Sequence, residues 1–350
     1  MTRYNSALTS LCECLHGRLP ARADWLSLIA LANQTLTSPA LIDLVNDFGS
    51  QIPEDVCAYV RHIHKRNLAR NDRLTVQLQE AVAAINEHGT IPVLLKGAAM
   101  LATAPPAQRG TRLMVDLDIL VEPHRIETAL NALAKLGYEL HSQSTADLEK
   151  WFAELKRPQD VGMIDLHRSP PGPAYFYHPI GDVLQNCRLV SFGRAYAYIP
   201  TATYQALILI IHDEFQDRDY WVGQLDLRHL HELRHLINSP EGVDWKQLAS
   251  FAKSKLARNA LETQFVALSQ LLAVDVPHHM CKRLIPRLQF ARRLMQARFP
   301  VTRWPLLLAT TLDYTNYRRG PGAESRRPGR ILRRLQVIAN ITSNLRTGKV

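Results

Sequence analysis

Two aspartates spaced two residues apart interrupt an apolar stretch in the first half of the chain. The stretch covers residues 114–121, and the acids are Asp116 and Asp118. In a β-strand, residues i and i+2 lie on the same face, so both carboxylates are expected to point the same way, while Val115 and its apolar neighbours face a core. Two acids on one face of an apolar strand cost free energy unless a cation binds them. A divalent metal ion together with phosphate oxygens suits such a pair.

Charged residues precede this strand at a sharp break in the pattern. An apolar run, 91–95, ends at Lys96 and Gly97, and Arg112 stands four residues before the first aspartate. A further run that reads as a strand, 162–167, carries a third acid, Asp165, and a histidine, His167. Because Asp165 and His167 are again two residues apart, they are expected to share one face of their strand.

The segments that must position these residues alternate between strands and helices. Apolar patterning predicts strands at 91–95, 114–121, 138–141, 162–167, 188–192 and 195–199. Helices are predicted at 97–103 and from Pro123 to a stop at Gly137, where Ile126, Leu130, Leu133 and Leu136 line one side. Such alternation predicts a mixed α/β sheet.

Helical patterns flank this central part on both sides. We expect a helical N-terminal region at 1–89, an α/β core at 90–200, and a helical C-terminal region with a basic tail at 201–350. Helices in the last region are predicted at 202–215, 224–237 and 245–274, followed by a link at 318–334 and a final helix at 331–345. The fold class is therefore α+β, with a mixed α/β core between helical regions.

Composition describes an ordinary globular protein. The 350 residues are 46% apolar and 21% charged, enough for two or three packed units. No apolar run approaches the ~18 residues that a membrane-spanning helix needs, and the N-terminus lacks the apolar segment of a signal peptide. The five cysteines are odd in number and scattered, which favours free thiols in a reducing compartment. We expect a cytoplasmic location.

Positive charge is concentrated in the last fifth of the chain. Residues 281–350 contain 16 lysines and arginines against 2 acids, although the whole chain carries only +10. A basic block of this kind binds nucleic acid, an acidic peptide or a membrane surface, or it forms the solvated face of a helix. The sequence leaves these alternatives open.

Taken together, the motifs resemble the nucleotidyltransferase superfamily, and specifically the bacterial branch called nucleotidyltransferase family 5. That branch has a strand ending in Lys-Gly, an arginine before an Asp-x-Asp strand, a Gly-Tyr after the next helix, and an acid-x-His strand. This chain has LLKG, RLMVDLDILV, LGY and IDLH in that order. Most members of the wider superfamily have Gly-Ser where Lys96-Gly97 stands here. The resemblance covers residues 90–235.

This resemblance implies transfer of a nucleotide from a nucleoside triphosphate to an acceptor hydroxyl. The acceptor would be RNA, a protein or peptide, or a small molecule, and the basic tail favours an anionic one. Asp116 and Asp118 are then expected to hold Mg²⁺ or Mn²⁺. Asp165 would complete a metal site or take the proton of the nucleophile, and His167 would orient that carboxylate or bind substrate.

The positions around the first helix are implied to bind the nucleotide. Gly97 at a helix N-terminus would offer backbone N–H groups to phosphate, where the helix dipole favours an anion. Lys96 or Arg112 would neutralise the triphosphate. The pattern also includes His212 and Asp226, which we expect to form a buried hydrogen-bonded pair between helices rather than to act in catalysis.

Two other functions compete with this hypothesis. A non-catalytic scaffold that binds a partner or peptide would keep the fold, but would have no reason to retain three buried acids. A zinc peptidase is suggested by the motif at 231–235, H-E-L-R-H, in which two histidines one helical turn apart bind zinc and Glu232 acts as the base. A third zinc ligand would be Glu241 or Asp244. Arg228 before the motif and Arg234 within it oppose a bound cation.

Overall fold

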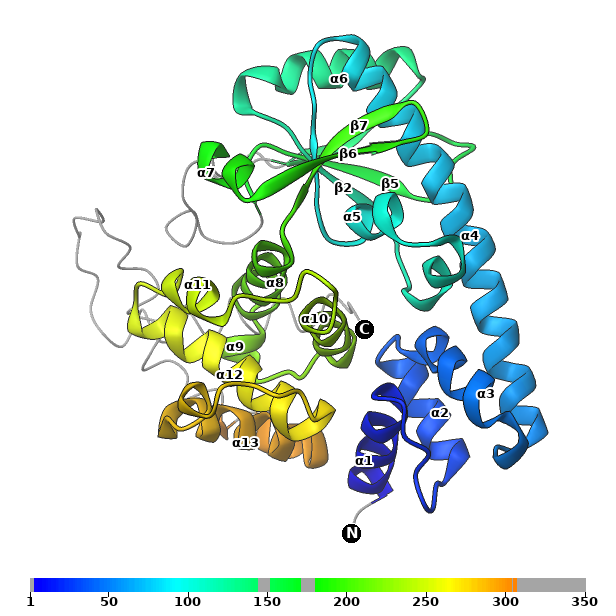
Figure 1. Ribbon diagram of the computed structural model, residues 1–350, viewed down its shortest axis with the longest axis vertical. Coiled ribbons are helices and arrows are strands. Elements are labelled where there is room, and N and C mark those ends of the chain that lie inside the picture. Colours follow the sequence, from blue (N-terminus) through cyan, green and yellow to red (C-terminus); the bar gives the residue numbers. More distant parts are fainter. Residues whose placement is uncertain (1–2, 144–151, 171–179, 304, 307–350) are drawn as a thin grey trace.

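The computed structural model of the protein describes residues 3–143, 152–170, 180–303 and 305–306. Its centre is a mixed sheet of seven strands in the order β3-β4-β5-β2-β1-β7-β6. The strands are β1 (Val93–Leu94), β2 (Asp116–Leu120), β3 (Glu139–Gln143), β4 (Phe152–Lys156), β5 (Met163–His167), β6 (Cys187–Phe192) and β7 (Ala195–Pro200). The pairs β2/β5 and β1/β7 are parallel and the others antiparallel. The predicted α+β fold, with a mixed sheet between helical regions, is confirmed (Figure 1).

Two details of the sheet differ from the prediction. Strand β4 was not predicted, because its alternation is short and its stability comes from pairing with β3 on one side and β5 on the other. Val115 was expected in the core, but 65% of it is exposed. The reason is that β2 begins only at Asp116, so Val115 lies before the alternation of the strand applies.

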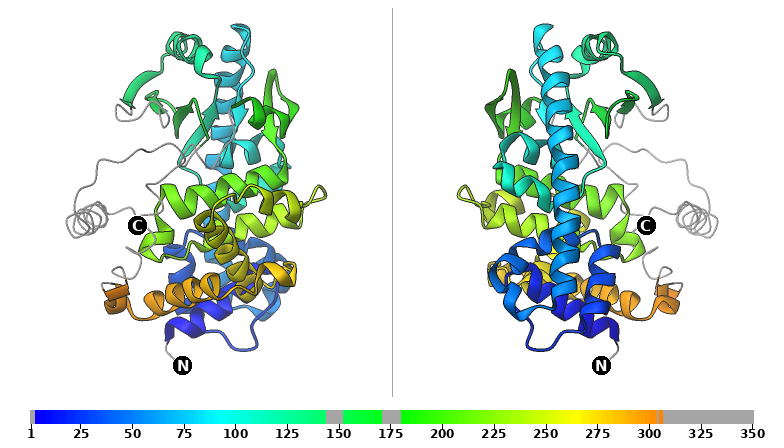
Figure 2. Two further views of the ribbon diagram at one scale, coloured as in Figure 1. Left: turned by 90° about the vertical axis from the view of Figure 1, so that its left-hand side faces the viewer. Right: turned by 90° about the vertical axis from the view of Figure 1, so that its right-hand side faces the viewer.

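One long helix, α4 (Glu54–Glu87), joins the sheet to the helical part of the molecule (Figures 1 and 2). It ends before Gly89, which has the positive φ of 73° that a glycine tolerates best, as predicted. Apolar residues of its C-terminal half, among them Leu78 and Val82, share a core with the sheet and with α6 (Ile126–Lys135). Leu117 and Ile119 of β2 belong to this core. Asp116 and Asp118, which alternate with these two residues, therefore lie on the other face of the sheet.

The N-terminal and C-terminal helices form one common core rather than two separate ones. The N-terminal helices are α1 (Arg3–Leu15), α2 (Trp25–Gln34) and α3 (Ile42–Phe48). The C-terminal helices are α8 (Ala202–Ile211), α9 (Asp219–Val222), α10 (Leu227–Ile237), α11 (Trp245–Ser250), α12 (Lys255–Leu272) and α13 (Leu284–Arg298). Leu11 and Leu28 are buried in the same cluster as Phe265, and α1 packs against α12 (Figure 1).

The helical regions also depart from the predicted boundaries in places. The single helix expected at 245–274 is two, since Ser254 caps the N-terminus of α12 with its side chain. The remaining α-helices of the described residues are short: α5 (Lys96–Thr103) and α7 (Ile180–Gln185). The predicted link at 318–334 and the final helix at 331–345 lie outside the described residues. The domain boundaries stay a proposal, because α4 takes part in both cores.

Each of the five cysteines is a free thiol, and three of them are buried. Across the described residues, every helix is too short or too polar to cross a lipid bilayer.

Candidate active site

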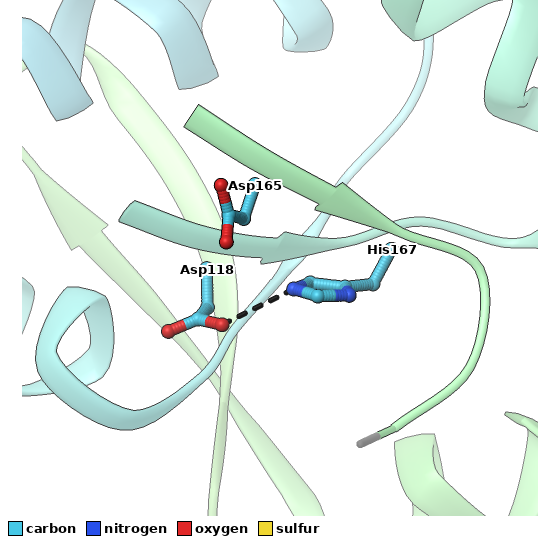
Figure 3. A group of neighbouring side chains, drawn as sticks. All are labelled: Asp118, Asp165 and His167. Carbon is cyan, nitrogen blue, oxygen red and sulfur yellow. Dashed lines mark hydrogen bonds and ion pairs between the residues drawn. The ribbon is translucent and has the colours of Figure 1, made fainter. Parts of the chain in front are cut away.

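Parallel pairing of β2 with β5 brings the predicted acids together. Asp118 stands directly opposite Asp165 in the register, and His167 lies two residues further along β5. Side chains at matching positions of neighbouring parallel strands share one face of the sheet. One ligand atom from each of these three residues lies within 4.8 Å of the others (Figure 3).

Two cationic or potentially cationic groups contact Asp118. The Nζ of Lys96 lies 3.0 Å and the Nε2 of His167 lies 3.1 Å from the same carboxylate oxygen, Oδ1. Burial by itself would raise the pKa of Asp118, but the Lys96 ammonium and the His167 hydrogen bond outweigh it and hold the pKa well below its usual range. Asp118 is therefore ionised at neutral pH. His167 orients this carboxylate, whereas the sequence had suggested that it orients Asp165.

Asp165 has the opposite electrostatic character. Burial, followed by the charges of Asp116 and Asp118, raises the pKa of Asp165 to about 7. Its Oδ1 is buried and has no hydrogen-bond partner among the described residues. A buried carboxylate oxygen without a donor, facing an ionised carboxylate, matches the oxygen ligands that Mg²⁺ and Mn²⁺ take. The residues present thus fit the divalent metal implied by the sequence.

The raised pKa of Asp165 predicts a dependence of stability on pH. The folded state holds the proton of the Asp165 carboxyl group more tightly than the unfolded chain does. The stability that this protonated group contributes is therefore fully present below about pH 4 and is lost as pH rises through about 7. In EDTA at pH 8, the free energy of unfolding of Asp165→Asn should be about 2–4 kcal/mol larger than that of wild type. This difference should vanish near pH 4. Urea unfolding at several pH values measures this. A difference that does not change with pH would contradict the assignment.

Three further predicted residues, Asp116, Lys96 and Gly97, lie at the starts of β2 and α5. Asp116 is half-buried at the beginning of β2, close enough to Asp165 to contribute to its raised pKa. Gly97 is the second residue of α5, and Leu95 before the helix gives no side-chain cap. The N–H groups of Ala98 and Ala99 both donate to the backbone carbonyl of Leu95. Lys96 adopts a left-handed φ of 47°, which is uncommon for a residue with a side chain and is often found at functional sites.

Gly97 also permits a close approach of two side chains. A Cβ at this position would lie 2.6 Å from the Cε of Met114 and 3.0 Å from the Nη1 of Arg112. The Nε of Arg112 lies 2.8 Å from Oε1 of Glu232, and both side chains are largely buried. This ion pair joins the segment before β2 to α10. The predicted role of Arg112 with phosphate stays a prediction, and in this structure its guanidinium is paired with a carboxylate.

The geometry opposes the zinc-peptidase hypothesis. Glu232, the base in that hypothesis, is paired with Arg112, and the Nε2 atoms of His231 and His235 lie 3.0 Å from each other. Both of the expected third ligands have other roles. Asp244 caps α11, and Glu241 accepts from the backbone N–H of Ala202. Within the described part of the chain, the groups with metal-ligand geometry lie elsewhere.

Comparison with known proteins identifies the family of this chain. Residues 21–273 match the family described as uncharacterised nucleotidyltransferase. The chain belongs to this family. The predicted resemblance to nucleotidyltransferase family 5 is thereby confirmed, and family membership supports nucleotidyl transfer as the general activity.

One solved structure is similar at a low level. It is the solution structure of the antibiotic-resistance factor ANT(2'')-Ia, with 14% identity and a TM-score of 0.36, covering 57% of this chain and 96% of that one. A search of curated proteins found no match.

The sequence did not identify the residues of α4 that position the site of this nucleotidyltransferase. Asn67 donates to the carbonyls of Gly110 and Arg112, and Asn71 donates to that of Arg112 as well. Gln77 donates to the carbonyl of Gly162, just before β5. The sequence feature that could have identified these residues is that they are polar and lie on a helix face that is otherwise buried. Such residues are retained inside proteins when they satisfy backbone groups.

A second polar cluster lies in the helical part, where the expected pair is replaced by other contacts. The Nδ1 of His212 lies 3.3 Å from Oδ2 of Asp217, so the predicted pairing of His212 with Asp226 is wrong. Asp226 instead caps α10 by accepting from the N–H of His229. The Nδ1 of His229 lies 2.9 Å from Oδ1 of Asp213. The prediction had the right elements but the wrong partners, since helix pairing does not fix which side chains meet.

Proposed function

We propose that this protein is a metal-dependent nucleotidyltransferase that moves a nucleoside monophosphate from a nucleoside triphosphate to an acceptor hydroxyl. The observation that carries the proposal is the pair Asp118 and Asp165. It combines an ionised carboxylate with a buried carboxylate oxygen that has no hydrogen-bond partner within the described part of the chain. Membership of the nucleotidyltransferase family gives the general reaction. The finer statements below rest on the geometry of the site.

The three carboxylates Asp116, Asp118 and Asp165 would hold Mg²⁺ or Mn²⁺. When bound, such ions stabilise charge on the attacking and leaving oxygens of the phosphoryl group. His167 keeps Asp118 in one orientation through its 3.1 Å contact. Because Asp118 is ionised, it binds a cation without first losing a proton.

The triphosphate would bind at the start of α5. Its oxygens would accept from backbone N–H groups at the helix start near Gly97, where the dipole of the helix favours an anion. The ammonium of Lys96 is already within the site, 3.0 Å from Asp118, and can neutralise phosphate charge from there. Any role for Arg112 would require it to leave Glu232, so we assign the main cationic role to Lys96.

The acceptor is proposed as an RNA, a protein or peptide, or a small molecule with a hydroxyl group. The basic C-terminal region is the reason for preferring an anionic macromolecule. Part of its charge has structural roles, however, because Arg292 and Arg293 are buried in α13 and Arg283 pairs with Glu262. The five free thiols support the expected reducing, cytoplasmic environment.

Labelled nucleotides test the proposal directly. The protein is incubated with each α-labelled nucleoside triphosphate and Mg²⁺ or Mn²⁺, in a cell lysate and with purified tRNA, beside the double variant Asp116→Ala/Asp118→Ala. We expect label on an acceptor only with the wild type. If no acceptor is labelled and no triphosphate binds, the proposal is overturned in favour of the non-catalytic scaffold.

A further inference from the structure

Three arginines, which we call the arginine strip, line one side of helix α4. Arg66, Arg70 and Arg73 are four and three residues apart, so they lie within about 60° of one another around the helix axis. Arg66 and Arg73 are exposed, and Arg70 is half-buried. From Arg66 to Arg73 the strip extends about 10 Å along the helix. In the right-hand view of Figure 2, α4 runs along the face of the molecule that is turned toward the viewer.

The positive charge of the strip is not neutralised within the described part of the chain. Asp72, the acid next to Arg73 in the sequence, contacts Arg109 instead, at 3.7 Å. Burial, followed by the charge of Arg73, lowers the pKa of Arg70, as expected for two guanidinium groups that repel each other. An anion bound between these groups would relieve the repulsion.

Backbone contacts place the strip beside the starts of the two strands that carry the acids. The Nε of Arg70 donates to the carbonyl of Met114 at 3.2 Å, two residues before β2 begins at Asp116. The Nη2 of Arg73 donates to the carbonyl of Gln159 at 3.4 Å, in the turn before β5. Both side chains keep further N–H groups for a ligand, since a guanidinium carries five.

The start of β2 is exposed to solvent between the strip and the acids. Helix α4 covers the face of the sheet opposite to Asp118, so a ligand that contacts both must pass around the ends where β2 and β5 begin. Val115, next to Met114, is 65% exposed at this point. Because a strand rises about 3.3 Å per residue, Asp118 lies about 13 Å along β2 from the carbonyl that Arg70 contacts. A chain of a few linked units spans that distance.

The chemistry of the strip fits a chain of phosphates. Guanidinium groups bind phosphate oxygens through paired hydrogen bonds, and phosphates recur at regular intervals along a nucleic acid strand. Between residues 62 and 73, the other exposed residues on the same side of α4 are His62 and Ala69. This stretch therefore offers no large apolar anchor of the kind on which affinity for a protein partner usually depends. These features favour a nucleic acid over an acidic protein.

We propose that the arginine strip of α4 binds the phosphate backbone of a single-stranded RNA whose end carries the acceptor hydroxyl. This inference rests on the proposed nucleotidyl transfer and names its acceptor class. The RNA would lie along α4, and its last nucleotides would pass the start of β2 to reach the acids. The strip positions the acceptor and takes no part in bond making or breaking. It supplies the anion-binding surface that the buried arginines of α13 do not.

RNA binding without nucleotide or metal provides the test. Fluorescence anisotropy measures the affinity for a labelled single-stranded RNA of about 15 nucleotides in EDTA, over a range of KCl concentrations. Each phosphate contact contributes about 0.7 to the slope of log affinity against log salt. Arg66→Gln/Arg70→Gln/Arg73→Gln should therefore lower the magnitude of the slope by about 2 and the affinity by at least about 10-fold. Arg66→Gln/Arg73→Gln, which retains the contact with Met114, should lower the slope by about 1.4.

A control variant separates the strip from the total charge of the protein. Arg22→Gln/Arg188→Gln/Arg298→Gln removes three exposed arginines elsewhere in the molecule. It should change RNA affinity by less than about 3-fold, because charges farther away than the Debye length are screened. Triphosphate affinity and the free energy of unfolding, measured for every variant, should stay close to the wild-type values.

Different results overturn different statements. If wild type does not bind RNA, if the triple variant of the strip binds it as wild type does, or if the control variant loses as much affinity, the role of the strip is overturned. Polyglutamate that displaces the labelled RNA better than unlabelled RNA of equal charge would assign the strip to an acidic protein instead. Transfer to another acceptor but not to RNA overturns the acceptor class. If RNA binds through the strip but wild type with Mg²⁺ labels no acceptor, the proposed transfer falls and the RNA-binding strip stands.

Discussion

Asp118→Asn should abolish nucleotidyl transfer almost completely, with a loss of at least about 10³-fold in rate. A loss of this size corresponds to about 4 kcal/mol of transition-state stabilisation. Asparagine keeps the shape of the side chain but removes the ionised group that Lys96 and His167 surround at 3.0 and 3.1 Å. Without that charge, affinity for a divalent ion falls, and the Lys96 ammonium loses the partner that offsets its burial. Initial rates of labelled transfer and Mn²⁺ titration calorimetry would measure both effects.

The control for this prediction is another aspartate of the same protein. Asp72 lies on α4 with 53% of its side chain exposed and is 3.7 Å from Arg109. Asp72→Asn should leave both the transfer rate and Mn²⁺ affinity within about 2-fold of wild type, as surface pairs contribute little. A transfer rate for Asp118→Asn within about 3-fold of wild type would refute the place of Asp118 at the centre of the site.

Arg293→Met is expected to cause the largest loss of stability, about 3–5 kcal/mol. Arg293 and Glu214 are completely buried, with Nη2 2.5 Å from Oε2. Gln264 also donates to Glu214. Removing the guanidinium leaves a buried carboxyl group without its counter-charge, which costs far more than the intact pair contributes. Burial already raises the pKa of Glu214, so part of the cost would be relieved by protonation. Urea unfolding would measure the change.

Two comparison variants make this prediction specific. Arg258 forms a similar contact, 2.7 Å to Glu262, but 60% of its side chain is exposed. Arg258→Met should therefore cost less than about 1 kcal/mol. The double variant Glu214→Gln/Arg293→Met should recover much of the loss, because the unpaired carboxyl group is gone. Equal losses for Arg293→Met and Arg258→Met would show that burial does not decide the cost.

The buried arginines change the interpretation of the basic C-terminal region. Arg292 donates to the backbone carbonyl of Tyr220, and Arg293 neutralises a carboxylate, so neither is available to a nucleic acid. Composition cannot separate these residues from surface arginines, since it counts charge without location. An anionic acceptor would have to be bound by other basic residues of the chain.

Local backbone geometry explains what the sequence determined by itself. Strand alternation placed Asp116 with Asp118, and Asp165 with His167, because successive side chains of a strand point to opposite faces whatever surrounds them. The apolar runs and the Lys-Gly break located β2, β5 and the start of α5, and glycine after α4 marked its end. The order of motifs was sufficient to identify the nucleotidyltransferase family.

The tertiary structure alone decided which of these groups meet. Register between β2 and β5 set Asp118 opposite Asp165. The pairing of Arg112 with Glu232 joins residues 120 positions apart, and no local pattern specifies it. Partners of buried charges depend on which surfaces pack together, because each charge must find a counter-charge or a hydrogen bond wherever the fold places it. Periodicity along the chain fixes the face on which a side chain lies, and only the packed fold fixes its neighbour.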